Sequence, residues 1–250
     1  EVQIDAAKGV IERTVPGFSK NFILEIIPQE NERDVYELEQ VGTKVALRGS
    51  TGVAICSAFN RYLMDFCKCD VSWCGDQLNV PTILPVVTNK IRVSTPSKYR
   101  AYMNYCTFSY STPWWDWKRW QKEIDFMALK GINMPLAGIG LDAVWYNTLL
   151  KFGFSDLEAR EFLVAPSHQA WQWMTNIESF GGPLPKNWIV SHIELGQKMI
   201  ARQYSLGMMP IQQTFSGYVP RKMKEKFINS SILKKHGWCG FTGTAEVDPL

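Results

Sequence analysis

The spacing of hydrophobic residues along the chain changes at about residue 95. Before this point, residues 35–39 (Val-Tyr-Glu-Leu-Glu) alternate between apolar and polar positions, which is typical of a strand with one exposed face. Residues 53–66 instead carry apolar side chains every three or four positions, the pattern of an amphipathic helix. Strands are predicted over Phe22–Ile27, Asp34–Gln40, Thr43–Leu47 and Lys90–Val93. We therefore expect a small α/β domain over residues 1–95.

From Tyr99 onwards, strand-like and helix-like segments alternate. The predicted strands are Arg100–Cys106, Ile132–Ala137 and Met208–Phe215. The predicted helices are Trp115–Lys130, Leu141–Lys151, Ser167–Phe180 and Trp188–Leu206, with another after Pro220. This alternation predicts parallel strands joined by helices, as in a (β/α)8 TIM-type barrel. Because a complete barrel needs about 250 residues, we expect residues 96–250 to hold only its first βα units, as part of a longer protein.

Short signals mark several helix ends. Gly131 and Gly207 follow apolar-periodic segments, where glycine can adopt the left-handed conformation that ends a helix. Ser155 stands three residues before Glu158, which is the spacing of a capping box. These signals predict a helix that ends at Gly131, another that ends at Gly207, and one that begins just after Ser155.

Polar and aromatic residues collect where the first predicted strand after Tyr99 ends. On a strand, Asn104 and Cys106 point to the same side. Tyr110 and Trp114 follow in an aromatic loop, and flat aromatic side chains stack on sugar rings. Because barrel active sites are built from the loops at the C-terminal ends of strands, this region is the predicted site.

The same region resembles one enzyme family. The resemblance rests on five clusters in order: Asn104-Tyr105-Cys106-Thr107, Ser109-Tyr110-Ser111, Trp114-Trp115-Asp116-Trp117, Glu123-Ile124-Asp125 and Gly131-Ile132-Asn133. They resemble the first barrel unit of the α-N-acetylglucosaminidases, the glycoside hydrolases of family 89. The resemblance implies an exo-acting, retaining hydrolase that removes terminal α-linked N-acetylglucosamine, with a small α/β domain ahead of its barrel. It also implies that the two catalytic glutamates lie beyond the point that matches Leu250.

The resemblance further implies a substrate-binding role for particular residues. The asparagine and cysteine of the family's Asn-x-Cys motif map onto Asn104 and Cys106, and a pocket tryptophan maps onto Trp171. Tyr110 and Trp114 are expected to line the same loop. The alternative is that Asn104 and Cys106 fill the barrel interior and that Trp171 anchors a helix in the core. We expect that alternative for Trp117, Trp120 and Trp173.

The carboxylates of the chain offer no convincing catalytic pair, although glycoside hydrolysis normally uses two. Asp116 is expected to cap a helix, and Glu123 and Asp125 are expected to be solvent-exposed or ion-paired. Asp142 is better placed, just after the second strand, but it could equally cap the helix that follows. Many family members carry Gln-Glu where this chain has Leu141-Asp142. We therefore assign no catalytic residue within the chain.

Composition and charge exclude few classes of function. The chain is 46% hydrophobic and 20% charged, so it is globular rather than disordered. Its formal net charge of +3 is spread along the chain and does not favour nucleic-acid binding. No apolar run reaches the about 18 residues of a membrane span. The chain begins at Glu1, which fits a removed signal peptide and trimming equally. As part of the enzyme hypothesis developed above, we expect an extracytoplasmic protein, which is secreted, periplasmic or lysosomal.

The six cysteines fit no standard zinc spacing. Buried free thiols are the favoured interpretation, and a disulfide within residues 67–74 is the alternative in an exported protein. No metal or organic cofactor is implied.

The sequence is compatible with three functions. The first is the N-terminal part of an α-N-acetylglucosaminidase that acts on terminal α-N-acetylglucosamine glycans. The second is a non-catalytic carbohydrate-binding protein that uses the same tryptophans. The third is a glycosidase of other specificity, which the departure at Leu141-Asp142 keeps open. The oligomeric state is undetermined, and the isolated chain is expected to self-associate through unpaired strand edges.

Overall fold

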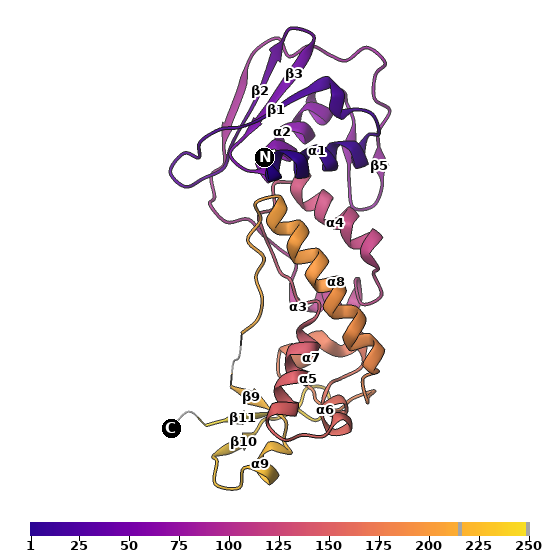
Figure 1. Ribbon diagram of the computed structural model, residues 1–250, viewed down its shortest axis with the longest axis vertical. Helices are drawn as coiled ribbons and strands as arrows, with labels where there is room; N and C mark the ends of the chain where they lie inside the picture. Colours follow the sequence, from indigo (N-terminus) through magenta and orange to yellow (C-terminus); the bar gives the residue numbers. More distant parts are fainter. Residues whose placement is uncertain (215–216, 249–250) are drawn as a thin grey trace. The chain divides into compact units, whose positions relative to one another are not determined.

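The computed structural model describes residues 1–214 and 217–248, and it is mixed α/β as predicted. The chain separates into two compact units (Figure 1). Unit 1 contains residues 1–102, 117–135 and 199–211, and unit 2 contains residues 103–116, 136–198 and 212–250.

A four-stranded sheet forms the centre of unit 1. Its strands are β1 (Phe22–Ile26), β3 (Lys44–Gly49), β2 (Val35–Val41) and β6 (Ile91–Ser94), in the order β1-β3-β2-β6. β1 pairs with β3 in parallel, and the other pairs are antiparallel. The four strands predicted from residues 22–93 are therefore confirmed, and Gly42, with φ of 58°, makes the turn between β2 and β3.

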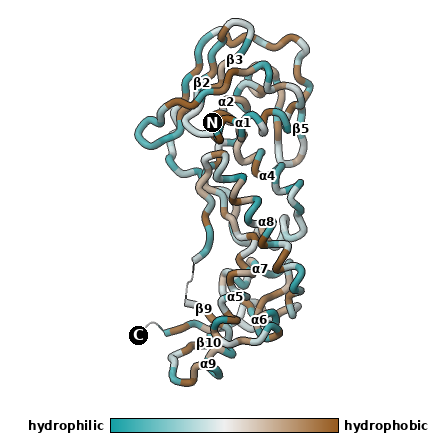
Figure 2. The backbone as a smooth tube through the Cα atoms, in the orientation of Figure 1, coloured by the Kyte–Doolittle hydropathy of each residue, from teal (hydrophilic) through white to brown (hydrophobic). Residues whose placement is uncertain are grey.

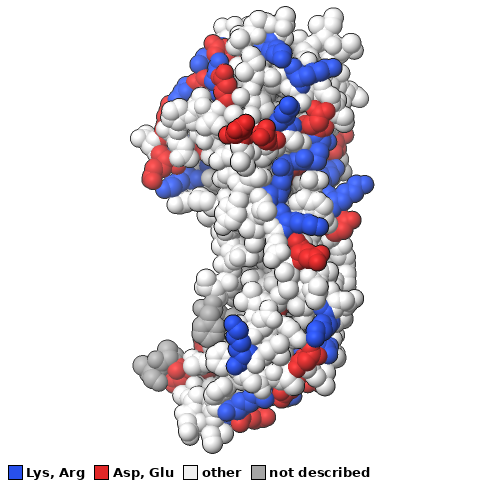
Figure 3. Space-filling model, in the orientation of Figure 1, with Lys and Arg blue, Asp and Glu red and all other residues white. Residues whose placement is uncertain are grey.

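The register places side chains of one kind in rows across this sheet. Leu24, Leu47, Leu38 and Ile91 are successive partners in one row, and Glu25, Arg48, Glu37 and Arg92 are partners in the next. Because neighbouring residues of a strand point to opposite faces, these rows make one face apolar and the other charged. Figure 2 shows that hydrophobic and hydrophilic residues are both present along these strands. Opposite charges meet directly on the charged face, where Arg48 binds Glu25 and Arg92 binds Glu37. Figure 3 shows acidic and basic side chains next to each other over this sheet.

Helix α2 (Gly52–Asp65) packs on the apolar face of the sheet. Thr51 caps it, because its side chain accepts a hydrogen bond from the Ala54 amide at 3.1 Å. Helix α1 (Val2–Thr14), which was not predicted from the hydrophobic pattern, packs against α2. Its buried face contains two alanines besides Val10 and Ile11, so its apolar periodicity is weak. The short helix η1 (Ser19–Asn21) and the hairpin of β4 (Asp70–Val71) and β5 (Asp76–Gln77) were also not predicted.

The strands predicted after Tyr99 are much shorter than expected. β7 (Ala101–Tyr102) and β8 (Met134–Pro135) pair in parallel over two residues each. The first strand was predicted to reach Cys106, but Met103 has φ of 73°, which ends extended structure. The third predicted strand, from Met208, is not a strand in its described part. Even so, the amides of Met209 and Ile211 donate to the carbonyls of Asn133 and Pro135, so this backbone runs beside β8; Phe215 lies outside the described residues.

Helix α4 (Trp117–Leu129) ends as predicted at Gly131, which has φ of 76°. The Ile132 amide donates to the Met127 carbonyl at 2.9 Å, as in a glycine-terminated helix. Two acidic residues of α4 are buried and ion-paired, which confirms one of the two expected outcomes. Asp125 accepts hydrogen bonds from Arg13 and Arg202. Glu123 accepts them from the Trp73 indole, the Tyr102 hydroxyl and Arg119.

Unit 2 is mostly helical. It contains α3 (Tyr105–Tyr110), α5 (Leu141–Lys151), α6 (Asp156–Phe162), η2 (Pro166–His168), α7 (Gln169–Trp173) and the first part of α8 (Lys186–Ser205). The bounds of α5 and the capping box of α6 agree with the prediction, and Gly207 follows α8 with φ of 80°. The helix predicted over Ser167–Phe180 ends already at Trp173, and Thr175 has φ of 70°.

A small antiparallel sheet completes unit 2, in the order β10 (Ile232–Lys234), β11 (Ala245–Val247) and β9 (Tyr218–Val219). It was not predicted, because each strand has only two or three residues. The helix expected after Pro220 is reduced to α9 (Met223–Lys226). Together with α5 and α6, these elements enclose the main apolar core of unit 2.

The cysteines are free thiols, of which Cys56, Cys67 and Cys69 are buried. Among residues 1–214 and 217–248, no group of three or more His, Cys, Asp or Glu side chains is placed to hold a metal ion. The helices of the described part include none with the length and apolar character to cross a membrane.

The contact between β3 and α2 predicts the effect of one substitution. A Cβ atom added at Gly49 would lie 2.4 Å from the Ile55 amide nitrogen and 2.7 Å from the Ala54 carbonyl carbon. Gly49→Ala should therefore lower the free energy of unfolding by about 3 kcal/mol, because backbone atoms must move. Urea unfolding measures this as a lower midpoint at an unchanged m-value.

Gly75→Ala is the matched control, because nothing lies within 4 Å of its added Cβ. An equal loss of stability in both variants would contradict this account of Gly49.

Candidate functional site

Asn104 is the N-cap of helix α3 and does not belong to a strand. Its Oδ1 accepts hydrogen bonds from the amide and the hydroxyl of Thr107, both at 3.1 Å. The prediction that Asn104 and Cys106 alternate along a strand was therefore wrong, because an Asn-x-x-Thr segment offers a cap that competes with extended structure. The side chain uses only Oδ1 in these contacts with the described residues. Its Nδ2 remains a hydrogen-bond donor on an exposed residue.

Cys106 and Tyr110 lie on one face of α3, because they are four residues apart. Cys106 is half-buried and Tyr110 is exposed. The Tyr110 ring meets Trp171 of α7 edge to face, with ring centroids 5.1 Å apart and an interplanar angle of 89°. The structure thus brings three predicted site residues to one surface of unit 2, beside Asn104.

Trp171 has a further aromatic neighbour that the sequence analysis missed. Trp238, from the loop between β10 and β11, lies parallel to it with ring centroids 6.4 Å apart and an interplanar angle of 14°. The Trp238 amide donates to the Asn176 carbonyl at 3.3 Å, which holds this loop near the end of α7. The only signal in the sequence is a tryptophan between two glycines, Gly237 and Gly240. We name Tyr110, Trp171 and Trp238 the aromatic cluster.

Trp114 lies in a different aromatic group. Its ring packs edge to face on Trp188 of α8 at 5.3 Å, and Trp188 stacks on His192 at 3.7 Å. Trp114 is 69% exposed, so its free face is available at the surface. The structure therefore does not place Trp114 in contact with the aromatic cluster.

The tryptophans predicted for the core behave differently from Trp171. Trp120 and Trp173 are buried, as predicted, and Trp117 is half-buried. Trp173 packs against Phe108 at 5.5 Å, and a Cβ atom at Gly138 would lie 2.8 Å from its ring. Because Gly138 has no side chain, the loop before α5 can pack directly against the Trp173 ring of α7.

Asp142 is the buried carboxylic acid of unit 2, with 3% of its surface exposed. It does not cap α5, whose N-cap position is Gly140 with φ of 92°. Its Oδ2 instead accepts a hydrogen bond from Gln169 Nε2 of α7 at 2.7 Å. Burial raises the pKa of the carboxyl to about 7, although the Gln169 amide and the nearby Trp188 indole N–H act in the opposite direction. The position in the first turn of α5 also favours a negative charge, but desolvation is the larger effect.

Glu178 is the second carboxyl of unit 2 with a strongly raised pKa. Burial raises the pKa to about 7, and the Arg221 amide, which donates to its Oε2 at 3.2 Å, lowers it in part. Neither Asp142 nor Glu178 is among the groups that shift the pKa of the other. They therefore do not behave as the interacting carboxylate pair of a glycosidase, and we assign no catalytic pair within the described residues.

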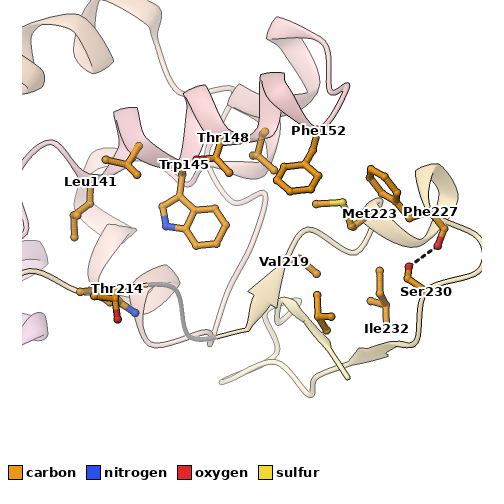
Figure 4. Close-up of a pocket in the computed structure, with 14 residues that line it drawn as sticks. Leu141, Trp145, Thr148, Phe152, Thr214, Val219, Met223, Phe227, Ser230 and Ile232 are labelled. Carbon is orange, nitrogen blue, oxygen red and sulfur yellow. Dashed lines mark hydrogen bonds between the residues drawn. The ribbon is translucent and has the colours of Figure 1, made fainter. Parts of the chain in front are cut away.

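An apolar pocket of about 450 Å³ lies in unit 2 beneath α5 (Figure 4). Leu141 and Trp145 from α5 line one part of the pocket, and Phe152 at the end of α5 lies near Met223 and Phe227 in the other part. The lining contains no charged side chain and none of the predicted site residues. Its few polar lining residues are Thr148, Gln213, Thr214 and Ser230, and the rest of the lining is apolar. Because none of the predicted site residues lines this pocket, we treat it as an extension of the apolar core and not as the candidate site.

The burial of Asp142 predicts a pH dependence of stability. In the unfolded chain this carboxyl loses its proton near pH 4, whereas in the folded chain it keeps the proton up to about pH 7. The folded state binds more protons between these values, so the free energy of unfolding falls as pH rises through this window. Asp142→Asn should remove this contribution, which is on the order of 3–4 kcal/mol for a shift of about three pKa units.

Urea unfolding at pH 4 and pH 8 measures the effect. The variant should gain stability relative to the wild type on going from pH 4 to pH 8, while the contribution of Glu178 is common to both proteins. Parallel pH profiles of the two proteins would contradict a neutral buried Asp142.

Known proteins share this architecture. Residues 5–86 match the family described as the alpha-N-acetylglucosaminidase (NAGLU) N-terminal domain, and residues 100–250 match the alpha-N-acetylglucosaminidase (NAGLU) tim-barrel domain. Human alpha-N-acetylglucosaminidase is 42% identical over 209 residues, which are 83% of this chain and 28% of the human protein.

Two solved structures from Clostridium perfringens superpose with a TM-score of 0.96 at 37% identity, over 98% of this chain and 28% of theirs. One is CpGH89 with two glutamates replaced by glutamine, in complex with its substrate GlcNAc-alpha-1,4-galactose. The other is a family 89 glycoside hydrolase in complex with 2-acetamido-1,2-dideoxynojirmycin. The chain thus spans little more than a quarter of the length of these relatives. The resemblance in residues 104–133 is confirmed, and the chain belongs to the alpha-N-acetylglucosaminidase family, the glycoside hydrolases of family 89.

Proposed function

We propose that this chain forms the N-terminal domain and the first part of the catalytic barrel of an exo-acting α-N-acetylglucosaminidase. Two observations support the proposal: the family membership, and related structures that hold a GlcNAc-containing substrate or an acetamido-sugar analogue. We also propose a division at about residue 95, into a small domain over residues 1–95 and barrel units over residues 96–250. The separate family matches of residues 5–86 and 100–250 support this division.

We propose that the chain supplies one wall of the sugar pocket. The observation that carries this proposal is the surface where Asn104 and Cys106 begin α3 and Tyr110 meets Trp171. The free Nδ2 of Asn104 can donate to a sugar hydroxyl, and Cys106 is a small apolar neighbour on the same helix. The Trp171 indole offers an apolar face to the C–H face of a pyranose.

Two further tryptophans extend this proposed wall. Trp238 lies parallel to Trp171 in the aromatic cluster, so it presents a second flat surface. Trp114 is exposed in the loop between α3 and α4 and is assigned to the outer part of the same region.

The catalytic carboxylates are proposed to lie in the rest of the longer protein. In α-linked N-acetylglucosamine the 2-acetamido group is cis to the leaving group, so it cannot attack the anomeric carbon from behind. A retaining enzyme must then provide its own nucleophile and a second carboxyl that acts first as acid and then as base. The C. perfringens complex, with two glutamates replaced by glutamine and substrate bound, supports a pair of glutamates in these roles.

The proposed partners are glycans that end in α-linked N-acetylglucosamine, and the proposed location is extracytoplasmic: secreted, periplasmic or lysosomal. The two-carboxylate mechanism uses water and the protein's own side chains, so it requires no metal or organic cofactor.

Hydrolysis of an aryl α-N-acetylglucosaminide by the 250-residue chain and by the full-length protein tests the proposal. We expect activity only in the full-length protein. Activity in the short chain would require a carboxylate pair within it, with Asp116 and Asp142 as the first candidates. Saturable sugar binding without hydrolysis by either protein would indicate a carbohydrate-binding protein, and activity on another aryl glycoside alone would indicate a different specificity.

Trp171→Ala should raise the KM of the full-length enzyme by about 10–100-fold and change kcat much less. A stacking surface away from the reacting bond contributes equally to ground-state and transition-state binding, and a lost aromatic contact of this kind costs about 1–3 kcal/mol. Steady-state kinetics measure both constants.

Trp171→Phe is the control, because it keeps a flat apolar face and should recover part of the affinity. An unchanged KM in Trp171→Ala would remove Trp171 from the pocket.

A further inference from the structure

Helix α7 is too short to hold its own position. It has five residues, Gln169–Trp173, and a single helical turn is unstable in isolation. The placement of any side chain on α7 therefore depends on the contacts that surrounding elements make with it.

Four of the five residues of α7 are buried by such contacts. The Ala170 amide donates to the Ser109 hydroxyl at 3.0 Å, and the Gln172 side chain donates to the Phe162 carbonyl at 2.7 Å. Gln169, Ala170, Gln172 and Trp173 are buried, whereas Trp171 is partly exposed and faces Tyr110 and Trp238. The buried contacts thus present Trp171 at the surface.

The contact between Gln169 and Asp142 differs from the others. It joins two side chains, from α7 and α5, at 2.7 Å in the protein interior. A buried primary amide without an acceptor is costly, so the Asp142 carboxyl fixes the position of the Gln169 side chain at the start of α7. Among the described residues, Asp142 caps no helix and forms no ion pair, and its side-chain hydrogen bond is the one from Gln169.

The polar and titratable surroundings of Asp142 come from two further elements, α8 and β9. The indole N–H of Trp188 in α8 lowers the pKa of Asp142 but is itself buried without a hydrogen-bond partner among the described residues, and His192 stacks on that indole. Tyr218 of β9 is close enough for its own pKa to be influenced by Asp142. The groups that shift the pKa of Asp142 include no cation, and burial favours its neutral form.

We propose that Asp142 is a positioning residue for the sugar pocket: by holding Gln169, it fixes α7 and thereby the orientation of the Trp171 indole. The inference rests on the proposed role of Trp171 in substrate binding. Asp142 itself touches no substrate in this arrangement.

The test uses the full-length protein and a double-mutant cycle. Asp142→Ala should raise the KM for an aryl α-N-acetylglucosaminide by about 5–10-fold with kcat within about threefold. The contact that is lost binds the ground state and the transition state equally, so the chemical step is little affected. Asp142→Asn keeps an acceptor for Gln169 Nε2 and should stay within about twofold of the wild type. In the Asp142→Ala/Trp171→Ala double variant, KM should match that of Trp171→Ala alone, because both changes remove the same contact.

Two controls separate positioning from general stability. Asp125→Asn changes another buried aspartate, which is held by Arg13 and Arg202 in unit 1. It should lower stability while leaving KM unchanged at temperatures below unfolding. If Asp142→Ala does not fold, Gln169→Met removes the same hydrogen bond from the other side and should raise KM to the same extent.

Hydrogen exchange gives a readout that needs no activity. Amides of residues 165–176 should exchange faster in Asp142→Ala than in the wild type, and Asp142→Asn should retain the protection. A wild-type protein that does not cleave the glycoside would refute the proposed function, while this exchange difference would still support positioning. Unchanged KM and unchanged amide exchange in Asp142→Ala would overturn the inference. So would a double variant whose KM increase equals the product of the increases in the two single variants.

Discussion

The buried ion pair between Arg100 and Asp34 connects the main sheet of unit 1 to the first barrel strands. Asp34 lies just before β2 and also accepts a hydrogen bond from the Ser50 hydroxyl at 2.8 Å. Arg100 lies just before β7, and its amide donates to the Asn133 side chain at 2.8 Å while its carbonyl accepts from the Met134 amide. Its guanidinium also donates to the Gly131 carbonyl, where α4 ends. Because β7 and β8 have only two residues each, these side-chain contacts fix their start more than the strand ladder does.

Unit 2 also contains elements that are too short to be stable without contacts from their neighbours. α3 has six residues and α7 has five, so neither is stable through its own backbone. Asn104 caps α3, and Ser109 of α3 accepts a hydrogen bond from α7. Tyr110 and Trp171 of the aromatic cluster are therefore carried by two short helices that a buried hydrogen bond joins, whereas Trp238 comes from the loop between β10 and β11.

Buried carboxylates of similar exposure have different roles in the two units. Asp125 and Glu123 in α4 are matched by arginines, so charged groups compensate each other in the interior of unit 1. Asp142 has amide and indole neighbours instead, and burial holds it neutral up to about pH 7. A neutral carboxylic acid can join two helices without the cost of burying a charge. Apart from Arg119, which is one helical turn before Glu123, these partners are 27 to 112 residues away in the chain.

The sequence by itself determined the sheet of unit 1, helix α5, the capping box of α6 and the glycine that ends α4. Each of these is indicated by a hydrophobic period or a helix cap, and both involve residues that are close in the chain. It also determined the family, because rare-residue clusters recur in order from Asn104 to Asn133. Only the tertiary structure decided that α7 stops at Trp173 and that Trp238 lies parallel to Trp171. The physical reason is that two-residue strands and one-turn helices carry almost no periodic signal, so contacts between distant segments decide where they form and which side chains they bring together.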